Sequence, residues 1–277
     1  MLSYRHAFHA GNHADVLKHL TMSLVFEALG KKDKPYCYID THSGGVYYDL
    51  NSDEARKTGE AIEGILQVYN HPLLPKSYRS AIARCNDDGR LTRYPGSPAI
   101  AQSFQREQDC LHLMELHNTE IELLKQRTGR WHHTSIHHRD GFEGLPALLP
   151  PNPRRGLVLV DPSYEIKSDY SKTAQAVEKA YKRWSTGIFA VWYPILIADK
   201  SRFMLDQFEQ SGIRKILTIE MQRKAEPDET FGMIGSGMLL INPPYQLDQH
   251  LDTILPELAK ALLGDTAVAT VRWLVGE

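Results

Sequence analysis

Residues Gly156–Tyr164 read GLVLVDPSY, and this stretch decides the fold. Its run of aliphatic residues predicts a strand that is buried on both faces, as in the interior of a parallel sheet. The strand ends abruptly in an acid, a proline, a serine and an aromatic residue. Residues that follow such a strand lie at the carboxyl edge of the sheet, where open α/β proteins bind ligands. Asp161 and Tyr164 are therefore candidates for a binding site, although an Asp-Pro pair is equally common in a simple turn.

Strand-like and helix-like segments alternate along the chain. Further strands are predicted at residues 35–40, 111–116, 134–142, 187–193, 213–221, 237–245 and 269–275, and helices at 12–30, 118–125, 170–184 and 199–210. Such alternation predicts an α/β fold with a mostly parallel central sheet and helices on both of its faces. We expect one domain over residues 1–277.

Residues 49–92 interrupt this alternation. They contain two helix-like stretches, 54–69 and 77–85, separated by the sequence HPLLP at 71–75. We interpret them as a small helical insertion after the first strand. Insertions in sheet loops commonly carry substrate selection.

The composition is that of an ordinary globular protein. The 277 residues are 42% hydrophobic and 24% charged, with a formal net charge of −2. No apolar run is long enough to cross a membrane, and the N-terminus does not resemble a secretory signal, so we expect a cytoplasmic protein without membrane contact. A nucleic-acid partner would need a local basic surface, because the chain as a whole is slightly acidic.

Cysteine and histidine spacing predicts no metal site. Cys37, Cys85 and Cys110 are widely separated and match no metal or disulfide pattern, which favours reduced thiols. Eight of the thirteen histidines gather near residues 6–19 and 132–138, but without a paired set of ligands at metal-binding spacing.

The first predicted helix begins at Asn12, a plausible N-cap, and ends near Gly30. Beside its apolar stripe, a second face carries Asp15, Lys18, His19 and Met22. A solvated face and a face that lines a cleft are both compatible with this pattern.

The first strand closes on the loop Asp40–Val46, DTHSGGV. An acid followed by small residues and a glycine pair is typical of a nucleotide-type loop, because glycine lets the backbone approach a ligand closely. The glycine spacing differs from the dinucleotide fingerprint, which favours a cofactor without pyrophosphate. Further on, Ser97 followed by Pro98 is a good helix start, with Ser97 as the N-cap.

Four successive predicted strands end in an acid, namely Asp40, Glu115, Asp140 and Asp161. Their order places a row of carboxylates along one crevice. It resembles the Rossmann-like class I methyltransferases that use S-adenosyl-L-methionine. Residues 161–164, DPSY, look like the Asp-Pro-Pro-Tyr motif of the amino-group methyltransferases that act on adenine or cytosine.

The chain also resembles, over essentially its whole length, the RlmJ family of bacterial 23S rRNA adenine-N6 methyltransferases. The most specific matches are residues 2–6, 12–19, 94–98, 212–217, 237–238 and 242–244. The resemblance implies S-adenosyl-L-methionine as the cofactor, methylation of adenine 2030 in 23S rRNA, and no metal. It implies no obligate protein partner and an rRNA substrate that is protein-free or in an early assembly intermediate.

Site residues follow from the same resemblance. It implies cofactor binding by His19, His42, Ser97, Glu115, Asp140 and Gly141, with Lys18 at the same pocket. Asp40, the acid of the first loop, is predicted as a further cofactor-binding residue from the form of that loop. Asp161 would be the catalytic acid, assisted by Pro162 and Tyr164, and Tyr4 would contact the RNA.

The chemistry agrees with these roles. The lone pair of an exocyclic adenine amine is delocalised into the ring, so the amine is a weak nucleophile. A carboxylate and a backbone carbonyl that accept its two N–H bonds would favour a more nucleophilic nitrogen and orient it. Tyr164 can stack on a flipped-out base, and Pro162 stiffens the loop.

Two features depart from the family pattern. Ser163 stands where the motif usually has a second proline, which loosens the loop, but we expect activity to survive. Asn242–Tyr245, NPPY, matches the written motif better than residues 161–164, but it follows a late strand. A DNA adenine or small-molecule methyltransferase, and a non-catalytic RNA-binding protein that retains the cofactor pocket, are the alternative functions.

Overall fold

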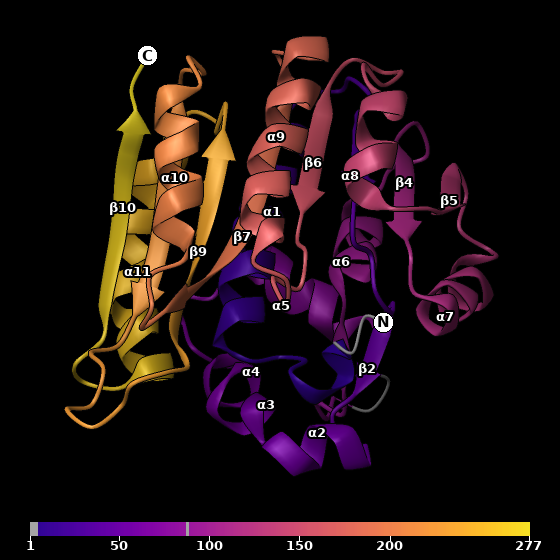
Figure 1. Cartoon of the computed structure of the whole chain (residues 1–277). Helices are drawn as coiled ribbons and strands as arrows, with labels where there is room; N and C mark the ends of the chain where they lie inside the picture. Colours follow the sequence, from indigo (N-terminus) through magenta and orange to yellow (C-terminus); the bar gives the residue numbers. More distant parts are fainter. Residues whose placement is uncertain (1–4, 87–88) are drawn as a thin grey trace.

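The computed structural model describes residues 5–86 and 89–277, and an eight-stranded sheet forms its centre (Figure 1). The strands are ordered β10-β8-β9-β7-β6-β1-β4-β5. Their bounds are β1 Cys37–Asp40, β4 Cys110–Glu115, β5 Thr134–His138, β6 Gly156–Val160, β7 Ile188–Leu196, β8 Ile216–Gln222, β9 Met233–Ile241 and β10 Val268–Val275. The strands β5, β4, β1, β6 and β7 are parallel neighbours, whereas β9 runs antiparallel to β7 and β8, and β10 antiparallel to β8. The predicted mostly parallel α/β sheet is confirmed.

Helices cover both faces of the sheet, as predicted. Strand β6 is buried along its entire length because alternate residues enter two different cores. Leu157 and Leu159 pack on the side of α1 His13–Gly30, α6 Ser97–Phe104, α7 Asn118–Thr128 and α11 Leu247–Leu263. Val158 and Val160 pack on the side of α8 Gly141–Gly144, η2 Leu145–Leu148, α9 Ser168–Arg183 and α10 Ser201–Gln210. Within residues 5–86 and 89–277, no helix has both the length and the apolar character that a membrane crossing requires.

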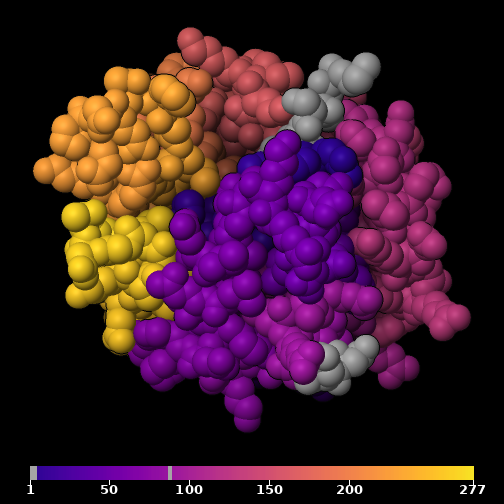
Figure 2. All heavy atoms as spheres, turned by 90° about the horizontal axis from the view of Figure 1, so that it is seen from below, coloured from indigo at the N-terminus to yellow at the C-terminus, as the bar shows by residue number. Residues whose placement is uncertain are grey.

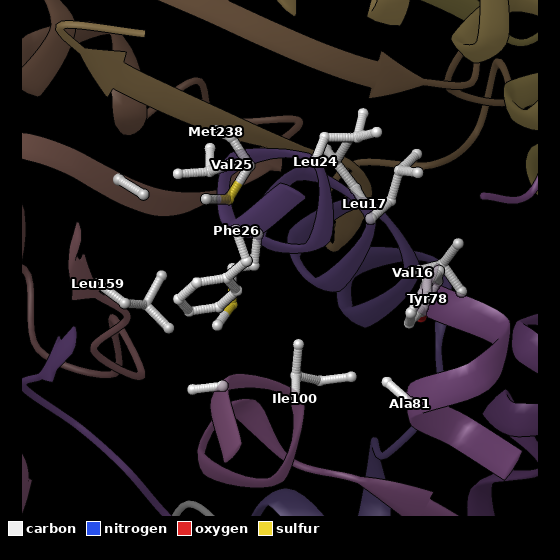
Figure 3. Close-up of a cluster of buried hydrophobic side chains, with 14 of the residues drawn as sticks. Val16, Leu17, Leu24, Val25, Phe26, Tyr78, Ala81, Ile100, Leu159 and Met238 are labelled. Atoms are coloured by element: carbon white, nitrogen blue, oxygen red, sulfur yellow. The ribbon is translucent and has the colours of Figure 1, made fainter. Parts of the chain in front are cut away.

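Helix α1 is buried on nearly all sides. The side chain of Asn12 accepts a hydrogen bond from the backbone N–H of Asp15, so the predicted N-cap is confirmed. Phe26 and its neighbours lie between the sheet, represented by Leu159 and Met238, and the helices that carry Ile100 and Tyr78 (Figure 3). The helix therefore joins the sheet to the segment that follows β1.

That segment holds four short helices between β2 Tyr47–Asp49 and β3 Arg93–Pro95, which pair antiparallel. They are α2 Asp53–Thr58, α3 Glu60–Glu63, α4 Ile65–Val68 and α5 Lys76–Ala83. In the view from below they cover the centre of the molecule, next to the N-terminal residues (Figure 2). A Cβ at Gly64 would lie 2.0 Å from the carbonyl oxygen of Gly11, so glycine permits this close packing.

Several predicted boundaries are wrong. The helix predicted at 54–69 is divided at Gly59, which has a φ of +69°, and at Gly64. The strand predicted at 134–142 ends at His138, and α11, which contains Pro256, was not predicted. Gly96, not Ser97, occupies the N-cap position of α6, and Ser97 is the first helical residue.

The aromatic cluster at Phe26 gives a first prediction. Its ring is 1% exposed and lies 5.3–5.9 Å, between ring centroids, from those of Tyr36, Tyr38 and Phe104. Phe26→Ala should lower the free energy of unfolding by about 3–5 kcal/mol, because it removes buried apolar surface and leaves a cavity. Urea denaturation measures the change. Phe203→Ala, at a side chain that is 59% exposed, is the control and should cost less than about 1 kcal/mol. Equal losses for both variants would contradict the role given to α1.

Candidate active site

A cavity of about 570 Å³ opens at the carboxyl edge of the parallel strands. Its volume lies within the range of small-molecule sites, about 300–1,000 Å³. Most of the residues expected at the site line this one cavity: Lys18, His19, His42, Ser97, Glu115, Asp140, Gly141, Asp161, Pro162 and Tyr164. The parallel order β5-β4-β1-β6 brings them together. Tyr4 lies outside the described residues.

Asp40 does not line the cavity. Its fully buried carboxylate accepts hydrogen bonds from the hydroxyls of Tyr38 at 2.6 Å and Ser97 at 2.7 Å, and from the backbone N–H of His42 at 3.2 Å. Burial raises the pKa of Asp40 to about 6. Asp40 thus fixes the loop after β1 and the start of α6. Ser97, which faces the cavity, is held by this acid instead of capping its helix.

Glu115, at the end of β4, contacts the glycine loop. Its Oε2 accepts a hydrogen bond from the N–H of Gly44, and its Oε1 accepts one from the N–H of His117, both at 2.7 Å. Burial raises the pKa of this carboxyl group. The carboxylate is therefore rigidly placed at the cavity wall, with lone pairs left for the hydroxyls of a ligand.

Asp140 and Gly141 bring the third loop against the first. One oxygen of Asp140 accepts hydrogen bonds from the N–H groups of Phe142 and Glu143. A Cβ at position 141 would lie 2.0 Å from the carbonyl oxygen of Thr41, so only glycine lets the two loops meet. Phe142 packs edge-on against the ring of His42, with the ring centroids 4.9 Å apart.

Lys18 lies between two carboxylates. Its Nζ is 2.7 Å from Oδ2 of Asp161 and 2.9 Å from Oδ1 of Asp15. Burial by itself would lower the pKa of Lys18, but the two acids together raise it well above its usual range. Asp15 also accepts from His6 and from the N–H of Gly11. Of the two interpretations of this helical face, the structure therefore supports the one in which it lines a cleft.

The cavity-lining histidines His19 and His42 are uncharged. Burial lowers the pKa of His19 to about 3 and that of His42 to about 4. Nδ1 of His19 is hydrogen-bonded to the hydroxyl of Tyr94 at 2.8 Å, and that hydroxyl is bonded to Tyr78 at 2.6 Å. Through this chain, α5 of the insertion orients a cavity-lining side chain.

The DPSY loop is held by its aromatic residue. Tyr164 has a φ of +53°, a strained conformation for a bulky side chain that is found mostly at functional sites. Its hydroxyl donates to the carbonyl oxygen of Trp192 at 2.7 Å, and its ring centroid lies 4.5 Å from that of Tyr170. The side chain is mostly buried, so it anchors the loop that presents Asp161 while one part borders the cavity. Pro162 and Ser163 also line the cavity.

The rival motif, Asn242–Tyr245, lies elsewhere. Because β9 is antiparallel to β7, Asn242 emerges at the opposite, amino edge of the sheet, where its side-chain N–H groups donate to the carbonyl oxygens of Ser185 and Gly187. Tyr245 is 90% exposed. Strand direction therefore removes this motif from the candidate site.

Sequence reasoning missed several cavity residues. Phe142 directly follows an acid and a glycine at a strand end, which is a signal that could have revealed it. Trp192 and Met233 lie in strands, and nothing in their sequence context marks them. Asp169 and Lys172 come from the first two turns of α9, and Asp169 precedes the predicted start of this helix at residue 170.

The fold and the cavity together define an α/β protein with a cavity of small-molecule size at the carboxyl edge of its sheet. Comparison with known proteins identifies the family of this chain. Residues 33–275 match the family model described as "Ribosomal RNA large subunit methyltransferase D, RlmJ", and the chain belongs to this family.

Two relatives extend over the full chain. The chain is 46% identical to Ribosomal RNA large subunit methyltransferase J of Escherichia coli (strain K12) and 43% identical to that of Haemophilus influenzae, with both proteins covered completely. Among solved structures, protein LPL1258 of Legionella pneumophila has 36% identity and a TM-score of 0.88, and the match covers 96% of this chain and 98% of that one.

A methyltransferase of this kind uses S-adenosylmethionine, and the cavity fits that cofactor. Its wall presents the carboxylates of Glu115, Asp140 and Asp161. These groups can accept hydrogen bonds from the amino and hydroxyl groups of such a ligand.

The neutral state of His19 predicts a pH dependence. Its pKa is about 3 in the fold against an ordinary 6.5, so the unfolded chain takes up the proton first as the pH falls. The stability from His19 is complete above about pH 6.5 and is lost towards pH 3, at up to about 1.4 kcal/mol per pH unit. His19→Gln should show a shallower decline in urea denaturation between about pH 7 and pH 5. The same change at exposed His250 is the control, and equal slopes for all three proteins would refute the assignment.

Proposed function

We propose that this protein transfers a methyl group from S-adenosylmethionine to the exocyclic N6 of an adenine in 23S rRNA, at the position numbered 2030. The observation that carries the proposal is the carboxylate of Asp161, which follows β6, faces the cavity and is paired with Lys18. Two relatives that match the chain over its full length bear the name Ribosomal RNA large subunit methyltransferase J, which supports the rRNA substrate.

Different residues of the cavity would bind different parts of the cofactor. Glu115 would bind the ribose hydroxyls, and Asp140 with Gly141 would bind the adenine of the cofactor. Lys18, His19, His42 and Ser97 would surround its methionine part, with Asp40 acting through Ser97 and the loop after β1. When bound, S-adenosylmethionine supplies an electrophilic methyl group.

The target amine would be bound at the DPSY loop. One carboxylate oxygen of Asp161 accepts a hydrogen bond from the ammonium group of Lys18. The other oxygen is then available to accept a hydrogen bond from an N–H of the adenine amine. The backbone carbonyl of Pro162 would accept the second N–H. Together they orient the nitrogen lone pair and withdraw it from the ring, and the proton leaves to Asp161 or water after transfer.

The base itself would lie against the aromatic part of the loop. The ring of Tyr164 borders the cavity and is braced by Tyr170 and Trp192, so it offers a fixed surface for a flipped-out adenine. Tyr4 would contact the RNA from the N-terminal side. The helical insertion, on the same edge of the sheet, is suited to RNA selection.

Replacement of Asp161 tests the mechanism. Asp161→Ala should lower the methylation rate on protein-free 23S rRNA by at least about 100-fold, because the amine loses its acceptor. S-adenosylhomocysteine binding, measured by calorimetry, should change far less. Tyr245→Ala, in the NPPY turn at the opposite edge, should keep full activity. An Asp161→Ala protein that methylates like wild type would refute the role of Asp161.

The substrate needs its own experiment. Wild-type protein should methylate protein-free 23S rRNA, and mass mapping of nuclease fragments should place one methyl group on N6 of one adenine. Duplex and single-stranded DNA and free adenosine, tested in parallel, should remain unmodified. Methylation of DNA but not rRNA would establish the DNA alternative, and no transfer to any substrate would favour the non-catalytic one.

A further inference from the structure

Two cysteines that are far apart in the sequence meet at the amino edge of the sheet. Cys37 begins β1 and Cys110 begins β4, and these residues are direct partners in the parallel pairing of the two strands. Side chains alternate along a strand, so His112, two residues further, points to the same face as Cys110. Ligand atoms of the three residues all lie within 4.8 Å of one another.

A second imidazole contacts this group. His137 is the partner of Met114 in the pairing of β4 with β5, and therefore lies on the same face as His112. Its Nε2 is 3.3 Å from Nδ1 of His112, so His137 helps to orient the ring of His112. Two thiols and one imidazole thus form the cluster, on the side of the sheet covered by η2 and the loop that follows it.

The dimensions suit a tetrahedral metal ion. With metal–sulfur bonds of about 2.3 Å and metal–nitrogen bonds of about 2.0–2.1 Å, neighbouring ligand atoms are roughly 3.4–3.8 Å apart. The ligand atoms of Cys37, Cys110 and His112, which lie within 4.8 Å of one another, are close to that spacing. Thiolate and imidazole donors select thiophilic cations such as Zn²⁺ over Mg²⁺ or Ca²⁺.

Charge favours the same occupant. Cys37 is fully buried and Cys110 half-buried, so an unpaired thiolate would be costly here. A divalent cation with two thiolates, one neutral imidazole and a water molecule has no net charge, and can therefore be buried without a further counter-ion. On binding, each thiol exchanges its S–H bond for an S–metal bond, and two protons leave to solvent.

We propose that Cys37, Cys110 and His112 form a binding site for one Zn²⁺-like cation, with a water molecule in the fourth position and His137 orienting the imidazole. None of the four residues lines the cavity at the carboxyl edge. Three residue steps of β1, about 10 Å, separate Cys37 from Asp40. The site would join β1 and β4 near their amino ends and take no part in methyl transfer.

Cobalt titration provides the test, because four-coordinate Co²⁺ with thiolate ligands has strong visible and charge-transfer absorption. The full-length protein, kept in a thiol-free reductant, should take up one equivalent of Co²⁺ with these bands, and Zn²⁺ should displace it. Zn²⁺ should also raise the Tm. Cys110→Ser and His112→Gln should lose the bands and the shift in Tm.

Cys85→Ser is the matched control, since Cys85 lies in the insertion and its thiol bonds to the carbonyl oxygen of Ile82. It should titrate like wild type. Far-UV circular dichroism of the metal-free variants checks the fold, and if Cys110→Ser does not fold, His112→Gln decides. The proposal is overturned if reduced wild type gives no cobalt bands, or if folded His112→Gln binds Co²⁺ as tightly as wild type.

Discussion

The burial of the Lys18 ammonium between Asp15 and Asp161 is the constraint on which the candidate site depends. It connects α1 to the DPSY loop, 143 residues later in the chain. A buried charge is stable only when it is fully paired, and removal of one partner from such a group typically costs about 3–5 kcal/mol. Helix α1 can therefore be buried only if both Asp15 and Asp161 are in position to pair with Lys18. This explains why α1, unlike a surface helix, has no solvated face.

The insertion belongs to the same arrangement. His9 and Asn12 both bond to the carboxylate of Glu60 in α3, and the Tyr78–Tyr94–His19 chain extends from α5 to the cavity. These bonds are specific in direction, so the insertion fixes the orientation of cavity-lining residues as well as covering the edge of the sheet. A substrate that docks on the insertion would contact the elements that position the cavity wall.

Much of this arrangement could be predicted from the sequence, because long apolar strands and the acids that end them are local signals. The run GLVLV and the acids Glu115, Asp140 and Asp161 are in this class. Other features depend on tertiary contacts. Asp40 faces inward because Ser97 and Tyr38 offer it donors, and Gly96 takes the cap position as a result. The polar face of α1 was ambiguous, since nothing local distinguishes a solvated lysine from one that meets an acid on a distant loop. The meeting of Cys37 and Cys110 depends on strand order, which their spacing does not reveal.

The reversal of β9 has a practical consequence. Two similar tetrapeptides, DPSY and NPPY, follow strands of opposite direction. One turn presents its aromatic residue inward, and the other extends Tyr245 into solvent. The second turn is a convenient attachment point for a fluorophore or a surface tether. A cysteine introduced there would hold a reporter at the amino edge of the sheet, opposite the cavity at the carboxyl edge. The insertion and the carboxyl edge would remain accessible to large ligands.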